Sequence, residues 1–278
     1  DSPAKMEKAY HSGADAIILD IEDSVAEANK ADARKAAADF ITTKAGSAGP
    51  QLWVRINPLS GVHAMQDLDG VVAARPHGVV LPKPDSAEHV KTLSAELERR
   101  EADAGLAAGV ISILPIATET PISVFQLHTY VGAGDRLAGL TWGAEDLSSA
   151  IGAVSARDDA GELTGPYQVA RALCLAGAAA AGVPAVETVY PAFRDLDGVK
   201  AYAGRGRRGG FVGMMAIHPA QVAAINEGFT PSDEELKFAQ RVVELFAANP
   251  DAATLGLDGK MLDRPHLVQA ERLLARVR

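Results

Sequence analysis

The stretch AIILDIED, residues 16–23, is a short apolar run that ends in three carboxylates, and it is the first of several such runs from which the fold is inferred. Residues 16–21 do not alternate between polar and apolar side chains, so a strand over this range is expected to be buried on both faces. Strands of this kind occur in parallel sheets that helices cover. Asp20, Glu22 and Asp23 then lie at the carboxyl end of the first visible strand.

Six further apolar runs follow, and helix-like segments separate them. The strand candidates are residues 16–21, 52–56, 78–81, 110–116, 137–142, 185–189 and 211–217. The helical candidates are residues 3–11, 27–41, 62–74, 86–104, 122–130, 166–181 and 194–202. Apolar runs that alternate with helices predict a parallel sheet built from βαβ units.

Seven strands behind a leading helix favour an α/β fold of the (β/α)8 TIM-barrel type. Closure of that barrel needs eight strands, so the first strand is expected upstream of Asp1 and missing from this chain. A doubly wound open sheet is the competitor, and periodicity alone does not exclude it. Residues 1–230 are expected to form the barrel. Residues 231–278, with helical spacing at 232–248, are expected to form a helical extension or lid.

Composition excludes several classes of protein. With 47% hydrophobic residues the 278-residue chain is not disordered, and no apolar run approaches the ~20 residues that span a bilayer. The single cysteine, Cys174, forms no internal disulfide and rules out a Cys-rich zinc module, which favours a cytoplasmic location. A net charge of −9 argues against a nucleic-acid-binding surface.

Polar side chains collect at or near the carboxyl ends of all seven runs. They are Asp20, Glu22, Asp23, Arg55, Asn57, Lys83, Glu119, Glu145, Asp146, Glu187 and His218. In a barrel these ends converge on one mouth, where active sites are built. The mixture of carboxylates and cations favours a catalytic mouth over an ordinary solvent-facing rim.

The carboxylates at these ends have two uses. Glu119 and Asp146 could bind a hard divalent ion, since Mg²⁺ takes one or two protein carboxylates together with water and substrate oxygens. The group after residues 16–21 is expected instead to pair with Arg55 or Lys83, because a buried carboxylate without a partner is costly.

Nucleophilic catalysis has weak support. There is no G-x-S-x-G motif, and Cys174 lies in an Ala/Leu-rich helix, where a buried inert thiol is expected. Lys83 could form a Schiff base, but nearby acids should keep its amine protonated. The run AGRGRRGG, residues 203–210, lacks the phosphate-loop pattern and is interpreted as a solvated turn.

Four motifs carry a family resemblance. They are DIEDSV at residues 20–25, VRIN at 54–57, GAED at 143–146 and IHPAQ at 217–221. In this order they resemble the HpcH/HpaI aldolase and citrate-lyase β-subunit superfamily, specifically its malyl-CoA and citramalyl-CoA lyase-like branch. The resemblance covers most of the chain and implies a TIM barrel that uses Mg²⁺.

Carried over residue by residue, the resemblance places the magnesium ligands on Glu119 and Asp146. It places the arginine that binds the substrate carboxylate on Arg55. Contact with the coenzyme A portion falls on Lys8. The loop around Ile217 and His218 is implied to border the substrate, and Glu145 of the GAED motif is also a substrate-binding candidate.

The C-terminal segment matches the lid pattern of the lyase branch. Residues 259–263 read GKMLD, and the resemblance implies that Asp263 enters the mouth of a neighbouring subunit as an acid/base, which requires a homo-oligomer such as a trimer or hexamer. The alternative is that Asp263 caps a helix over residues 265–276. Two departures from the family concern the coenzyme A site: Met214 stands where a lysine is common, and Ser2 stands where an arginine is common.

These observations predict a Mg²⁺-dependent lyase that cleaves a 3-hydroxy-3-carboxyacyl-CoA to a 2-oxo acid and a short acyl-CoA. The base for the substrate hydroxyl is left open between a metal-bound water and the Asp20/Glu22 group. The alternatives are a malyl-CoA-type thioesterase on the same site, a citrate-lyase β-subunit that acts with an acyl-carrier protein, and an aldolase for 2-oxo acids without coenzyme A. Neither nucleic acid nor membrane is expected as a partner.

Overall fold

The computed structural model describes residues 2–159 and 161–275. Its chain divides into two compact units, Asp1–Glu227 and Gly228–Arg278, which are considered separately below. No helix of the described ranges has the length and apolar character needed to cross a membrane.

The first unit is built on seven parallel strands. They are β1 (Ala16–Asp20), β2 (Gln51–Arg55), β3 (Gly78–Leu81), β4 (Ser112–Pro115), β5 (Leu140–Thr141), β6 (Ala185–Glu187) and β7 (Gly213–Met214). β1 to β4 form one parallel sheet and β5 to β7 another. Parallel bridges from Ile113 to Leu137 and from Ile116 to Thr141 connect β4 to the run that contains β5.

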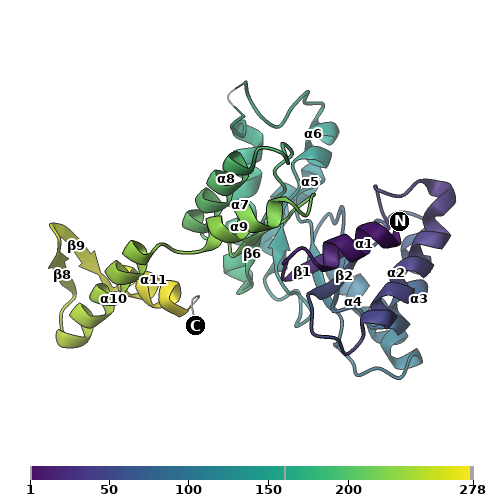
Figure 1. Cartoon of the computed structure of the whole chain (residues 1–278), viewed down its shortest axis with the longest axis horizontal. Coiled ribbons are helices and arrows are strands. Elements are labelled where there is room, and N and C mark those ends of the chain that lie inside the picture. Colours follow the sequence, from purple (N-terminus) through teal and green to yellow (C-terminus); the bar gives the residue numbers. More distant parts are fainter. Residues whose placement is uncertain (1, 160, 276–278) are drawn as a thin grey trace. The chain divides into compact units, whose positions relative to one another are not determined.

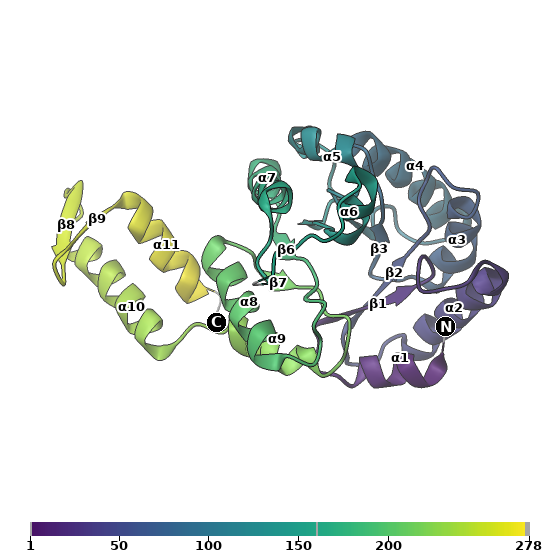
Figure 2. The same ribbon diagram turned by 90° about the horizontal axis from the view of Figure 1, so that it is seen from above.

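Helices connect these strands and lie outside them. They are α1 (Pro3–Tyr10), α2 (Lys30–Lys44), α3 (Ala64–Val71), α4 (Ala87–Asp103), α5 (Pro121–Phe125), α6 (Glu145–Ile151), α7 (Gly165–Ala181), α8 (Leu196–Gly209) and α9 (Gln221–Phe229). Short 3₁₀ helices η1 (Glu27–Asn29), η2 (Val72–Ala74) and η3 (Leu127–Tyr130) adjoin them. Figure 1 labels the helices and some of the strands, and Figure 2, which also labels β3, shows α1 to α4 along the outside of β1 to β3.

The strand order confirms the α/β barrel prediction. Neighbouring strands are consecutive in the chain from β1 to β7, whereas a doubly wound sheet reverses its order at a switch point. All four residues of β3 are buried, as expected for a strand covered on both faces. The same expectation is wrong for β1, whose burial alternates and whose Ile18 is 37% exposed. Gly78 is required in β3, because a Cβ at this position would lie 2.1 Å from the Trp53 ring of β2.

Another local prediction in this unit is wrong. The run at 203–210 is not a solvated turn, because α8 continues through Gly209. Gly204 and Gly206 are buried in this helix, so their small size suits a helix packed closely against its neighbours. The helix ends where Gly210 adopts a φ of +115°, which favours glycine.

The second unit contains the helices that its spacing predicted and, between them, a β-hairpin that the spacing did not predict. Its elements are α10 (Asp233–Ala248), β8 (Thr254–Leu257), β9 (Lys260–Asp263) and α11 (Arg264–Ala275). Asp258 and Gly259 both have positive φ, as a tight turn between antiparallel strands requires. Phe246 and Leu262 are almost fully buried and belong to the apolar core of this unit.

Candidate functional site

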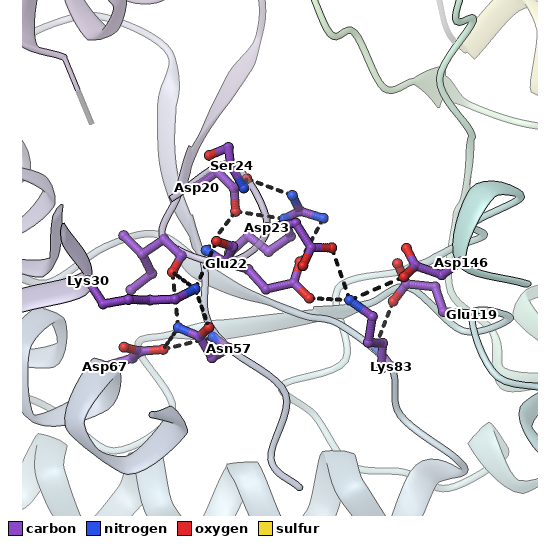
Figure 3. Close-up of polar contacts among 12 residues, drawn as sticks. Asp20, Glu22, Asp23, Ser24, Lys30, Asn57, Asp67, Lys83, Glu119 and Asp146 are labelled. Carbon is purple, nitrogen blue, oxygen red and sulfur yellow. Dashed lines mark hydrogen bonds and ion pairs between the residues drawn. The ribbon is translucent and has the colours of Figure 1, made fainter. Parts of the chain in front are cut away.

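The ends of β1 to β5 bring charged side chains from five segments into one connected cluster. Asp20 and Arg55 are the last residues of β1 and β2. Lys83 and Glu119 follow β3 and β4, and Asp146 lies in the first turn of α6. Because these strands are parallel, their carboxyl ends meet at one edge of the sheet (Figure 3).

Arg55 is held by two carboxylates. Its Nε and Nη2 donate to the Asp20 oxygens at 2.8 and 2.6 Å, in the fork geometry that guanidinium and carboxylate favour. Burial raises the pKa of Asp20, but the hydrogen bonds and charge of Arg55 lower it by more, so that the net shift is downward. Burial disfavours the Arg55 cation, yet Asp20 and Glu22 outweigh burial and raise its pKa. Asp20 and Arg55 therefore form a fixed ion pair.

Glu22 lies between the two cations of the cluster. Its side chain is 2% exposed, and its Oε1 accepts a hydrogen bond from Lys83 Nζ. Its Oε2 lies 2.9 Å from Arg55 Nη1 without the geometry of a hydrogen bond, so this oxygen forms an ion-pair contact alone. Burial raises the pKa of Glu22, and the charges of Lys83 and Arg55 offset only part of that rise.

Lys83 connects Glu22 to the acidic groups on the other side of the cluster. Its Nζ lies 3.0 Å from Asp23 Oδ2 and 3.3 Å from Asp146 Oδ1. Burial alone would lower the pKa of Lys83, but the bonds to Glu22 and Asp23 and the charge of Asp146 raise it. A protonated amine is not the nucleophile that a Schiff base requires. The backbone of Lys83 has φ of +51°, a strained conformation for a residue with a Cβ.

Glu119 and Asp146 form an acidic pair that suits a hard divalent cation. Glu119 is 4% exposed, and its Oε2 accepts a hydrogen bond from the Lys83 backbone N–H at 2.6 Å. Burial, together with the charges of Asp146 and Glu22, raises its pKa to about 8. Two carboxylates that disfavour each other's charge are the donors that Mg²⁺ takes, with water and substrate filling its other positions. No group of three or more His, Cys, Asp or Glu within the described ranges forms a larger metal cage.

Gly143 leaves room for this pair. A Cβ at Gly143 would lie 2.7 Å from Glu119 Cγ, closer than side-chain atoms approach. The GAED motif therefore provides the Asp146 carboxylate and, three residues earlier, the space in which Glu119 lies.

The remaining predicted substrate residues lie outside this contact network as far as the described residues show. Lys8 is exposed on α1, and Glu145 is exposed at the start of α6. Ile217 is 53% exposed after β7, and His218 stacks on the Phe193 ring at 4.9 Å between centroids.

The loop that carries Ile217 and His218 is fixed by a residue whose role the sequence did not indicate. Gln221 is fully buried, and its Oε1 accepts hydrogen bonds from the backbone N–H groups of Ile217 and His218 at 2.9 and 3.2 Å. Its Nε2 donates to the Tyr190 carbonyl at 2.9 Å, so Gln221 joins the segments that follow β6 and β7.

Glu187 ends β6 but does not belong to the acidic cluster. It is fully buried and accepts hydrogen bonds from Trp142 Nε1 at 2.6 Å and from Arg171 Nε at 2.8 Å. Tyr202 of α8 adds a third donor at 3.2 Å. Glu187 therefore connects the sheet to α7 and α8.

Asp263 ends β9 in the second unit. Its side chain is 38% exposed and its Oδ1 pairs with His266 Nδ1, one turn into α11. At the other end of β9, Arg241 supports the hairpin turn by donating to both Asp258 oxygens at 2.8 and 2.7 Å. Asp263 thus lies at the junction of strand and helix, half open to solvent.

Comparison with known proteins identifies a family and its members. The model of the HpcH/HpaI aldolase/citrate lyase family matches residues 1–219. A (3S)-malyl-CoA thioesterase from Cereibacter sphaeroides strain KD131 is 31% identical over 274 residues, which is 98% of this chain and 89% of the relative. A citrate lyase subunit beta-like protein from Mycobacterium tuberculosis H37Rv is 32% identical over 276 residues, 99% of this chain and 92% of the relative.

Solved structures extend this similarity to three dimensions. The CitE protein of Mycobacterium tuberculosis, in complex with magnesium, acetoacetate and coenzyme A, superposes with a TM-score of 0.78 at 31% identity. The superposition covers 99% of this chain and 92% of the CitE chain.

Proposed function

Because the chain belongs to the HpcH/HpaI aldolase/citrate lyase family, we propose that it is a Mg²⁺-dependent carbon–carbon lyase. Its proposed substrate is a 3-hydroxy-3-carboxyacyl-CoA such as malyl-CoA or citramalyl-CoA, and its products are a 2-oxo acid and a short acyl-CoA. The observation that carries the proposal is the clustering of Arg55, Glu119 and Asp146 with Glu22 and Lys83 through hydrogen bonds and ion pairs.

Glu119 and Asp146 are the proposed ligands of the magnesium ion. When bound there, Mg²⁺ supplies Lewis-acid polarisation of the substrate's hydroxyl and carboxylate oxygens. Lys83 holds both ligands in place, through its backbone N–H to Glu119 and its ammonium beside Asp146.

Arg55 is proposed to bind the substrate carboxylate. Asp20 fixes the guanidinium from one side, and the remaining Nη1 faces Glu22 Oε2 at 2.9 Å. This arrangement orients the 2-oxo acid half of the substrate relative to the metal ligands.

Two proton transfers accompany cleavage of the bond between the carbinol carbon and the carbon next to the thioester. The hydroxyl loses its proton while that bond breaks, and the electron pair moves into the thioester enolate. Glu22, whose pKa burial raises, is the proposed acceptor of the hydroxyl proton, with Asp20 holding Arg55 beside it. Asp263 is the proposed donor that protonates the enolate carbon to give the acyl-CoA.

We also propose that residues 1–230 form the catalytic domain and residues 231–278 a lid that acts on another copy of the chain. Asp263 would then serve a neighbouring subunit in a homotrimer or hexamer. Mixing an Arg55→Ala variant with an Asp263→Asn variant tests this assignment, because each supplies what the other lacks. Recovery of activity in the mixture supports action between copies, and two inactive proteins that stay inactive when mixed contradict it.

A thioesterase is the second candidate, favoured by the 31% identity to a (3S)-malyl-CoA thioesterase. In that reaction a water molecule adds to the thioester carbonyl and the coenzyme A thiolate leaves. The same Arg55 and metal ligands would bind the malyl carboxylate, but the carbon–carbon bond would stay intact.

Product analysis distinguishes the two reactions. Malyl-CoA, citramalyl-CoA and β-methylmalyl-CoA are incubated with the full chain, with Mg²⁺ and with EDTA, and the products are separated by chromatography. An acyl-CoA and a 2-oxo acid that form only with Mg²⁺ support the lyase. Free coenzyme A and malate indicate the thioesterase, and turnover that EDTA leaves unchanged contradicts both metal-dependent proposals.

A further inference from the structure

Lys30 is a buried cation that the proposed mechanism does not use. It begins α2 and is only 8% exposed. Its Nζ donates to Asn57 Oδ1 at 2.7 Å, to the Glu22 carbonyl at 2.9 Å and to the Ile21 carbonyl at 3.2 Å. These three acceptors use all three hydrogens of the ammonium group, and none of them carries a full charge. A buried ammonium is costly, so this complete set of bonds defines where the acceptors must lie.

Two of the three acceptors belong to the segment that presents Glu22. The Ile21 carbonyl accepts a second bond from Asn57 Nδ2 at 3.0 Å. From the other direction, the Glu22 N–H donates to Asp20 Oδ1 at 3.0 Å. The backbone of Glu22 is therefore fixed on its carbonyl side by Lys30 and on its amide side by Asp20.

Asp67 supplies the negative charge behind this arrangement. It is fully buried, and its Oδ2 accepts both the backbone N–H and the side-chain Nδ2 of Asn57 at 2.7 Å. Its Oδ1 accepts from Arg34 Nε at 2.6 Å. Asn57 therefore stands between the Lys30 ammonium and the Asp67 carboxylate, with its amide orientation set by both.

Figure 3 shows the consequence for the cluster. Lys30, Asn57 and Asp67 lie on one side of the Glu22 segment, and Lys83, Glu119 and Asp146 lie on the other. The Glu22 side chain contacts Lys83 Nζ and lies 2.9 Å from Arg55 Nη1. A shift of the Glu22 backbone would therefore move the one carboxylate that both cations share.

We infer that Lys30 is a positioning residue, which fixes the carbonyls of Ile21 and Glu22 so that the Glu22 side chain faces Arg55 and Lys83. Lys30 touches neither the proposed metal ligands nor the proposed substrate-binding arginine in the contacts described, so its effect passes through Glu22. The inference rests on the proposed function for its kinetic test, whereas its structural test needs no substrate.

The first experiment compares two lysines of one helix. Lys30→Met removes the ammonium at similar length, and Lys44→Met does the same at the other end of α2, where Lys44 Nζ pairs with Glu7 at 2.8 Å. Misplacement of a catalytic group by about 1 Å costs on the order of 100-fold, so Lys30→Met should lower kcat/KM about 10- to 100-fold. Lys44→Met should stay within about twofold. Equal kcat/KM in the two variants would overturn the inference.

The second experiment asks whether the effect passes through Glu22. In a Glu22→Gln background, Lys30→Met should lower kcat/KM by no more than about twofold, because the carboxylate that Lys30 positions is already gone. If Lys30 only stabilised the fold, Lys30→Met would lower kcat/KM by the same factor in both backgrounds, and that result overturns the inference. If Lys30→Met does not unfold cooperatively, the same cycle is run with Lys30→Arg, which keeps the charge but displaces the donors, and is judged by the same two outcomes.

Amide hydrogen exchange provides the measurement that is independent of activity. Lys30→Met should speed exchange in the peptide that covers residues 20–26 and leave peptides from α7 unchanged, because two of the three lost bonds hold the segment after β1 and none of them reaches α7. Unchanged exchange in residues 20–26 overturns the inference. If the wild-type chain cleaves none of the acyl-CoA substrates, the proposed function fails, and exchange still decides the role of Lys30.

Discussion

Two buried carboxyls, one before β4 and one after it, are held in opposite ways. Before β4, Glu101 is fully buried and takes four hydrogen bonds, from Arg136 at 2.7 and 2.6 Å and from the N–H groups of Gly109 and Ile111 at 2.9 and 3.0 Å. After β4, Glu119 is almost as deeply buried, yet the described contacts give it one hydrogen bond, from the Lys83 N–H.

The difference appears in the pKa of the two carboxyls. Burial raises the pKa of Glu101, but Arg136 and the two backbone donors more than reverse the rise, so its pKa is lowered. Burial and the charge of Asp146 raise the pKa of Glu119 to about 8. A carboxylate whose bonds are complete stabilises the fold, and one that the fold leaves short of partners is available to a ligand. Substitutions at these carboxyls and beside them test that division.

Glu119→Gln should break the metal site without breaking the fold. The amide keeps an acceptor for the Lys83 N–H but removes the charge that a divalent cation needs, so Mg²⁺-dependent kcat/KM should fall about 10³- to 10⁴-fold. The free energy of unfolding should stay equal or rise by about 1 kcal/mol, because a buried charge beside Asp146 is removed. Steady-state kinetics and urea unfolding measure the two quantities. Wild-type activity in this variant would exclude Glu119 as a ligand.

Glu101→Gln should give the reverse result. It leaves Arg136 buried without an anion, and breaking such a pair costs about 3 kcal/mol of unfolding free energy. The kcat/KM of the protein that remains folded should stay within about threefold. Glu88→Gln on the same helix is the matched control, since Glu88 pairs with Lys91 at the surface and its loss should cost less than about 1 kcal/mol of unfolding free energy. Equal losses of stability in both variants would contradict the contrast between the two strand ends.

The Glu101–Arg136 pair predicts how the free energy of unfolding depends on pH. The pKa of Glu101 is lowered on folding, so its stabilisation is fully present above the unfolded value, about 4.3, and is lost as the pH falls through the lower folded value. From about pH 4 downward, Glu101 contributes up to about 1.4 kcal/mol per pH unit to the loss of unfolding free energy. Urea unfolding at several acidic pH values should show a shallower slope for Glu101→Gln than for the wild type. Parallel slopes would show that Glu101 binds its proton equally in both states.

Much of the fold and of the charged cluster could be predicted from the sequence, because both depend on order along the chain. The apolar runs predicted seven strands. The predicted bounds 78–81 are those of β3, and all four of its residues are buried, as expected for a strand covered on both faces. The motifs also identified the family, which the match over residues 1–219 confirms. Arg55 and Asp146 were placed at strand ends, and parallel strands bring such ends together without further information.

What the sequence did not predict depends on the direction of side chains. Glu187 ends a strand, as Asp20 does, but its side chain accepts hydrogen bonds from Arg171 and Tyr202 in the helical layer. Successive residues of a strand face opposite sides of the sheet, so position at a strand end does not fix which side a side chain faces. Lys30 was missed for the same reason. A lysine at a helix start is usually solvated, and only the tertiary packing of α2 shows that this one is buried.

Gly143→Ala should have the smallest effect of these variants, because it adds a single methyl group beside Glu119. A Cβ there would lie 2.7 Å from Glu119 Cγ, so the Glu119 carboxylate must move by a few tenths of an ångström away from Asp146 or from the Lys83 N–H. Affinity for Mg²⁺, measured by calorimetry without substrate, should fall about tenfold, which corresponds to about 1.4 kcal/mol. Gly165→Ala, where no atom lies within 4 Å of the added Cβ, is the control and should leave that affinity unchanged. If Gly143→Ala binds Mg²⁺ as the wild type does, the position of Glu119 does not limit the metal site. The single hydrogen bond that the described residues give the buried Glu119 carboxyl would then have to be explained by contact with the substrate and not with the metal.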